Sequence, residues 1–120
     1  FLDAKVIRND NKYGITIIET GIGQLSIPEC QFEVGQQFRV RILSDDVSIT
    51  LSKSEDSSIS NIFKVKVKKI ATDSKHMKII TLESGSTQIK ARISKKSYEI
   101  LNLELNDEVF AQIKTVAITY

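Results

Sequence analysis

The sequence has few of the residues on which several common kinds of site depend. It contains one cysteine, one histidine and no tryptophan among 120 residues. A single cysteine excludes a framework of disulfides within the chain and fits a reducing compartment. No cluster of Cys and His has the spacing of metal ligands, so no metal site is expected. A Gly-x-x-x-x-Gly-Lys motif is also absent, so nothing resembles a nucleotide-binding P-loop.

Long hydrophobic runs and a strong excess of one charge are missing as well. No apolar segment is long enough to span a bilayer, and there is no signal-peptide pattern. Because the chain begins at Phe1 and not at Met, we expect a fragment of a longer protein. The 17 basic and 15 acidic residues give a net charge of +2, and aromatic residues make up 7%. This balance, with few rings for base stacking, predicts no nucleic-acid partner.

What the sequence does contain is the alternation that is typical of β-strands. Phe63, Val65 and Val67 alternate with three lysines, and this period of two predicts a half-buried strand with an exposed basic face. Turn signals rich in Asn, Asp, Gly and Ser separate the alternating segments. The predicted strands are residues 4–8, 15–19, 24–27, 38–42, 47–51, 63–68, 78–82, 87–93 and 109–119.

The two halves of the chain repeat one another. The repeated pairs are Lys5-Val6 with Lys64-Val65, Val40-Arg41-Ile42 with Ala111-Gln112-Ile113, and Val47-Ser48-Ile49-Thr50 with Val116-Ala117-Ile118-Thr119. The offset grows from roughly 60 to roughly 70 residues, as insertions in turns would produce. We therefore expect an all-β fold of two tandem OB-like Greek-key barrel lobes, residues 1–54 and 55–120, joined by the polar stretch 52–60.

One short helix is expected, in the second lobe only. Ser94 is a good N-cap, because its hydroxyl can accept from an amide of the first turn. Ile93 before it and Tyr98 after it are spaced as a hydrophobic staple. The helix would run from Lys95 to about Leu101.

The start of this helix is a candidate anion site. Helix starts expose unpaired N–H groups and a partial positive charge, and Ser94, Ser97, Lys95 and Lys96 add hydroxyls and charge. The alternative is that Ser94 only caps its helix while the lysines point to solvent. Lys114 interrupts the apolar run near the end of the last predicted strand, and an OB-like barrel can bring that strand end close to the helix start. The alternative is that Lys114 simply lies on the solvent-exposed face of its strand, as lysines on strands usually do.

Catalysis by this chain is not expected. His76 lies beside a predicted turn, and Cys30 has no histidine partner in a recognisable arrangement.

In the first lobe, the region that corresponds to the helix start contains Pro28, which removes a backbone donor, and Glu29, which adds a negative charge. We therefore expect the first lobe to be structural and to bind no oxyanion.

Segments from the whole chain resemble a known family. Ser57-Ser58-Ile59-Ser60-Asn61-Ile62 resembles the start of a Mop domain, and the runs from Ala91 to Ser94 and from Ala111 to Ile118 resemble its remainder. The runs from Tyr13 to Thr16 and from Leu25 to Pro28 resemble the segment ahead of Mop in one class, the ATP-binding subunits of molybdate ABC importers. The resemblance covers essentially all 120 residues.

The resemblance implies a Mop/TOBE-type regulatory domain that binds an oxyanion, molybdate or tungstate, and has no intrinsic cofactor. It implies an ABC ATPase domain on the same chain, a homodimer, a membrane permease as partner, and a place at the cytoplasmic face of the inner membrane. Two alternatives stay open: a structural dimerisation domain with a degenerate anion site, and a free-standing molybdate-storage protein. Sulfate has the same charge and shape as the other two anions, so the same pattern fits it.

The resemblance also implies which residues hold the anion. In related proteins it lies between two subunits: one gives a Ser-x-Arg-Asn segment, and the other gives hydroxyls at the helix start and a late lysine. The implied site residues here are Ser58, Ser60, Ser94, Lys95, Ser97 and Lys114. Ser60 stands where the family usually has arginine, so a fully charged bidentate donor is missing.

Overall fold

Alternating apolar residues form the strands of two antiparallel sheets. The computed structural model describes residues 1–53, 61–114 and 116–119. The strands are β1 (Leu2–Asp10), β2 (Ile15–Thr20), β3 (Gly23–Pro28), β4 (Gln37–Arg41), β5 (Val47–Thr50), β6 (Asn61–Ser74), β7 (Met77–Ser84), β8 (Thr87–Ser94), β9 (Glu108–Ile113) and β10 (Ala117–Thr119). A 3-10 turn, η1 (Ser44–Asp46), precedes β5, and one α-helix, α1 (Lys95–Leu101), follows β8.

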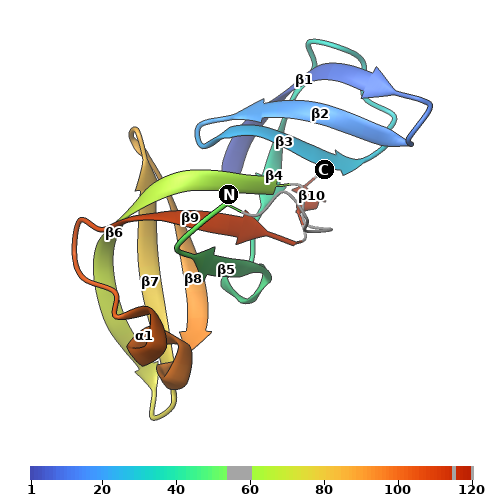
Figure 1. The fold of residues 1–120 in the computed structure, drawn as a ribbon. Coiled ribbons are helices and arrows are strands. Elements are labelled where there is room, and N and C mark those ends of the chain that lie inside the picture. Colours follow the sequence, from blue (N-terminus) through green and yellow to red (C-terminus); the bar gives the residue numbers. More distant parts are fainter. Residues whose placement is uncertain (54–60, 115, 120) are drawn as a thin grey trace.

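The strands divide between two five-stranded sheets that lie side by side (Figure 1). The first sheet has the order β10-β4-β1-β2-β3, and the second has the order β5-β9-β6-β7-β8. In each sheet a three-stranded meander is followed by a strand that returns beside the first, which is a Greek-key connection. The predicted all-β fold of two OB-like units is confirmed.

The last strand of each repeat pairs with the opposite repeat. β5, from the first half, lies on β9 of the second sheet, and β10, from the end of the chain, lies on β4 of the first sheet. The registers correspond: Ile49 faces Ala111, and its repeat partner Ile118 faces Val40. This strand exchange gives the chain an internal two-fold pattern. Each sheet therefore contains strands from both sides of residue 54. The division into lobes 1–54 and 55–120 stays a prediction about folding units.

One predicted strand is wrong. Residues 109–119 are not one strand, because β9 ends at Ile113 in the second sheet and β10 begins at Ala117 in the first sheet. The chain leaves one sheet at Lys114, whose side chain is exposed. The apolar pattern resumes after this residue because β10 is again a sheet strand, and periodicity does not reveal that the sheet has changed.

A single core joins the two sheets. The buried cluster includes Val6, Ile18 and Leu25 from the first sheet and Ile80 and Leu82 from the second. The β2–β3 turn packs directly on the second half, since a Cβ at Gly21 would overlap Thr87 Oγ1 and a Cβ at Gly23 would lie 2.9 Å from the Phe63 ring. The halves are thus packed against each other as well as joined by exchanged strands.

The predicted helix is confirmed. α1 spans Lys95–Leu101 with Ser94 as its N-cap, and it lies at one end of the second sheet (Figure 1). Ile93 belongs to the buried core and Tyr98 packs against that core, which agrees with the staple pattern. Asn102 ends the helix in the left-handed conformation, with φ of 50°.

Candidate functional site

Two predicted site residues meet at the start of α1. The Ser97 amide donates to Ser94 Oγ over 3.0 Å, and the Ser94 hydroxyl donates to Ser97 Oγ over 3.0 Å. The Lys95 amide donates to the carbonyl oxygen of His76 over 2.8 Å, which ties the first turn to the β6–β7 turn. The side chains of Lys95 and Lys96 are exposed. The result is a small polar surface of two hydroxyls flanked by two exposed positive charges.

Lys114 lies elsewhere on the chain. Its amide donates to the carbonyl oxygen of Asp46 over 2.9 Å, at the end of β9 beside β5. Figure 1 shows this end of β9 away from α1. Among the described residues, no hydrogen bond or ion pair joins Lys114 to Ser94 or Ser97. The expectation that one barrel brings this lysine against the helix start is therefore not met by contact within a single chain.

Ser58 and Ser60 lie outside the described residues. The residue that follows them, Asn61, is 8% exposed and bonds twice to the main chain of Ser26 in β3. The Ser26 amide donates to Asn61 Oδ1 over 2.8 Å, and Asn61 Nδ2 donates to the Ser26 carbonyl oxygen over 2.9 Å. The start of β6 is thus fixed to the first half of the chain.

An ion-pair cluster that the sequence did not single out lies on β8. Arg92 Nε donates to Asp73 Oδ2 over 2.7 Å, and its Nη1 donates to Asp45 Oδ1 over 3.4 Å. The bond to Asp73, with a smaller contribution from Asp45, raises the pKa of Arg92. Arg92 belongs to the run from Ala91 to Ser94 that carried the resemblance, but no role was assigned to it. In the sequence Lys90, Arg92 and Ser94 alternate with apolar residues, which places all three on the outward face of β8.

The lysines of β6 form the exposed strand face that alternation predicts. Val65 and Val67 are buried, while Lys64, Lys66 and Lys68 are exposed. Lys64 Nζ lies 2.9 Å from Glu108 Oε2, and this bond lowers the pKa of Glu108. Lys68 Nζ lies 4.0 Å from Glu83 Oε1. Because acidic side chains lie beside these lysines, the face has mixed charge.

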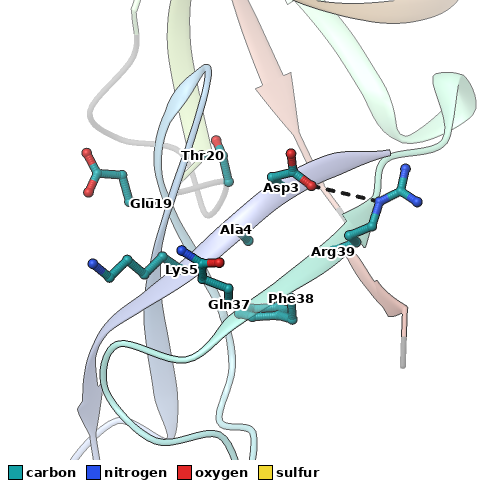
Figure 2. Close-up of a pocket in the computed structure, with 8 residues that line it drawn as sticks. All are labelled: Asp3, Ala4, Lys5, Glu19, Thr20, Gln37, Phe38 and Arg39. Atoms are coloured by element: carbon teal, nitrogen blue, oxygen red, sulfur yellow. Dashed lines mark ion pairs between the residues drawn. The ribbon is translucent and has the colours of Figure 1, made fainter.

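A shallow hollow on the first sheet contains none of the predicted site residues. Asp3 Oδ1 lies 3.9 Å from Arg39 Nε at one side of it (Figure 2). Two acidic side chains, Asp3 and Glu19, and two basic ones, Lys5 and Arg39, line it, so its charge favours no anion. The lining residues are Asp3, Ala4, Lys5, Glu19, Thr20, Gln37, Phe38 and Arg39.

The described part of the chain offers neither a metal site nor a membrane-spanning helix. In residues 1–53, 61–114 and 116–119, no three His, Cys, Asp or Glu side chains converge as metal ligands. No helix in the same ranges has the length and apolar character needed to cross a membrane. His76 is exposed in its turn, and Cys30 is half-buried without a disulfide.

The family follows from comparison with known proteins. Residues 57–119, more than half of the chain, match the model of the TOBE domain. This chain belongs to the TOBE domain family. The Mop/TOBE resemblance seen in the sequence is thereby confirmed. The match to a TOBE domain, a non-catalytic type, agrees with the prediction that this chain is not itself an enzyme.

The relatives of this TOBE domain extend the match to its first half. The molybdenum import ATP-binding protein ModC of Hahella chejuensis is 37% identical over 116 residues, which are 96% of this chain and 32% of that protein. The protein of the same name from Saccharophagus degradans is 38% identical over 120 residues, covering 98% of this chain and 33% of that protein. The chain therefore spans about a third of the length of the curated relatives it matches.

A solved structure has the same fold as this TOBE domain. It is described as the cytoplasmic molybdate-binding protein ModG, in a crystal form with molybdate bound. The two superpose with a TM-score of 0.79 at 19% identity, covering 98% of this chain and 94% of the other. At this identity the likeness establishes the shared fold, two OB-like units with a common core.

Proposed function

We propose that this TOBE domain binds molybdate or tungstate and regulates an ABC importer as part of its ATP-binding subunit. The observation that carries the proposal is the match of nearly the whole chain to molybdenum import ATP-binding proteins. The fold shared with a protein that is described with molybdate bound supports the same ligand class. In this proposal the ATPase domain is part of the same longer chain, the permease is its partner, and the domain works at the cytoplasmic face of the inner membrane.

The proposed ligands are the hydroxyls of Ser58, Ser60, Ser94 and Ser97 with the ammonium groups of Lys95 and Lys114. A dianion that leaves water needs formal positive charge nearby, because neutral dipoles alone do not offset its lost hydration. With Ser60 in the usual arginine position, Lys114 is the main source of that charge. The described residues give its ammonium group no ion pair, so it is available to a ligand.

The separation of Lys114 from the helix start supports a site shared between chains. Since these groups do not touch within one chain, a second copy would complete the set. A shared groove of this kind requires a symmetric, isologous contact. We therefore propose a homodimer through the second half of the chain, with the hydroxyls fixing the orientation of the anion.

The test is a calorimetric titration of molybdate into the parent and four variants. Lys114→Ala should abolish molybdate binding and leave the fold intact. Ser94→Ala should weaken binding less, and should also cost about 1 kcal/mol of stability through the lost helix cap. Ser60→Arg should tighten binding roughly tenfold or more by restoring a charged donor. Lys5→Ala, on the first sheet, is the control and should bind as the parent does. A Lys114→Ala variant with unchanged affinity would place the site elsewhere.

A second function is a structural one. The domain would hold an ATPase dimer together with a degenerate anion site, and the observation that favours this is Ser60 in the arginine position. The same titration separates the two functions, because a scaffold dimerises without binding molybdate. The storage function is favoured less, since the sequence relatives at 37–38% identity are ATP-binding proteins three times as long as the chain.

A further inference from the structure

A bridge of charged side chains connects the first half of the chain to strand β8. Arg92 of β8 binds two carboxylates, Asp73 at the end of β6 and Asp45 in η1. Asp45 belongs to the first half and is 47 residues from Arg92 along the chain. η1 packs against β8 at this point. The position of η1 on the second sheet is therefore linked to Arg92 by a direct bond.

The same turn holds Lys114. The residue beside Asp45 is Asp46, whose carbonyl oxygen accepts the Lys114 amide over 2.9 Å. Lys114 lies one residue beyond Ile113, where the ladder between β5 and β9 ends. The main chain of Lys114 is thus fixed by η1, while its side chain reaches solvent.

We propose that Asp45 and Arg92 are positioning residues for Lys114, so that the first half of the chain takes part in the oxyanion site. Arg92 fixes η1 through Asp45, and η1 fixes the backbone from which the Lys114 ammonium group extends. This inference rests on the proposed function, in which Lys114 supplies the main positive charge. It gives the first half a role in binding although no ligand comes from it.

Arg92 is not assigned as a ligand itself. Its guanidinium group lies between two carboxylates, so the local charge of the cluster is negative and repels an anion. A ligand role and a positioning role for Arg92 predict opposite effects of one substitution on the affinity for the anion. If Arg92 bound the anion, removing the charge of Asp45 would free the guanidinium group and tighten binding. If Arg92 positions Lys114 through Asp45, the same change weakens binding.

The experiment compares Asp45→Asn with the matched control Asp3→Asn, which alters another exposed pair of aspartate and arginine. We expect the molybdate Kd to rise about threefold to tenfold for Asp45→Asn and to stay unchanged for Asp3→Asn. Asp45→Glu keeps the carboxylate and should recover part of the lost affinity. Combining Asp45→Asn with Arg92→Lys should weaken binding no more than the more damaging single change, because both act on one contact.

Hydrogen exchange supplies a readout that general destabilisation would not give. In Asp45→Asn the Lys114 amide should exchange about tenfold faster, while the amide of Ile80 in the centre of the second sheet exchanges as in the parent. An unchanged or tighter Kd for Asp45→Asn, or an unchanged Lys114 amide, would overturn the inference. The parent and Lys114→Ala separate the two claims. If the parent binds no molybdate, the proposed function fails, and if Lys114→Ala binds as the parent does, the site lies elsewhere and this inference fails with it. If Lys114→Ala abolishes binding and Asp45→Asn has no effect, only this inference fails.

Discussion

Asn61 acts as a substitute for a neighbouring strand. β3 is at the edge of the first sheet, so one side of it has no strand partner among the residues that the structure describes. The side-chain amide of Asn61 satisfies both main-chain groups of Ser26 there, one as acceptor and one as donor. An open strand edge is a template for unwanted pairing, and Asn61 occupies part of it with a group from the same chain.

Replacing Asn61 should therefore be costly. Asn61→Ala removes two hydrogen bonds and leaves the Ser26 amide and carbonyl without their partner, which should lower the free energy of unfolding by about 2–4 kcal/mol. Asn11→Ala, in an exposed turn, is the control and should change stability by less than about 0.5 kcal/mol. Urea denaturation measures both. If Asn61→Ala were as stable as Asn11→Ala, water would replace the hydrogen bonds of Asn61 at no cost in free energy.

The pair of Lys64 and Glu108 gives a pH dependence with a definite sign. The bond to Lys64 lowers the pKa of Glu108 in the folded state below its ordinary value of 4.5. The pair therefore stabilises the fold above pH 4.5, and this contribution is lost as pH falls through the lowered pKa. In Lys64→Met the Glu108 pKa, followed by NMR titration, should rise toward 4.5. A pKa that does not move would show that solvent screens the pair completely.

At the scale of elements, the β2–β3 turn is fixed by close packing on β8. Gly21 has no room for a Cβ because Thr87 Oγ1 occupies that space. Gly21→Ala should therefore destabilise the protein by about 1–3 kcal/mol. Thr87→Ala removes the obstructing oxygen, so the double variant should be more stable than Gly21→Ala alone. Thermal unfolding of the two single variants and the double variant checks this, and purely additive losses would contradict it.

The elements that the sequence predicted are those with local causes. The helix from Lys95 to Leu101 follows from Ser94 and from the spacing of Ile93 and Tyr98, and most strands follow from alternation. The break after Ile113 was missed because two short strands in different sheets have the same period as one long strand. In the candidate site, the pair of Ser94 and Ser97 was predictable for the same local reason. The bond between Arg92 and Asp45 was not, because it depends on where η1 packs.

At the scale of the whole molecule, β10 is the part of the second half that completes the first sheet. A chain that ends at Lys114 lacks β10 and the packing of Val116 on the core. We expect the β4 amides to lose protection from hydrogen exchange and the truncated protein to associate through the exposed β4 edge, as light scattering would detect. A chain that ends at Thr119 keeps β10 and is the control. Parent-like protection of β4 in the truncated chain would contradict a structural role for the exchange.

The strand exchange also affects how the protein folds while it is made. A ribosome delivers β1 to β4 first, and β4 can pair with β1, yet its second neighbour β10 emerges only with residues 117–119, roughly 80 residues later. At cellular rates of translation this interval is on the order of 4–16 s. During that time β5 also waits for β9, so neither sheet is complete on the nascent chain. Both sheets acquire their last strands only after nearly the whole segment has left the ribosome, and final folding is delayed until translation of this region is finished.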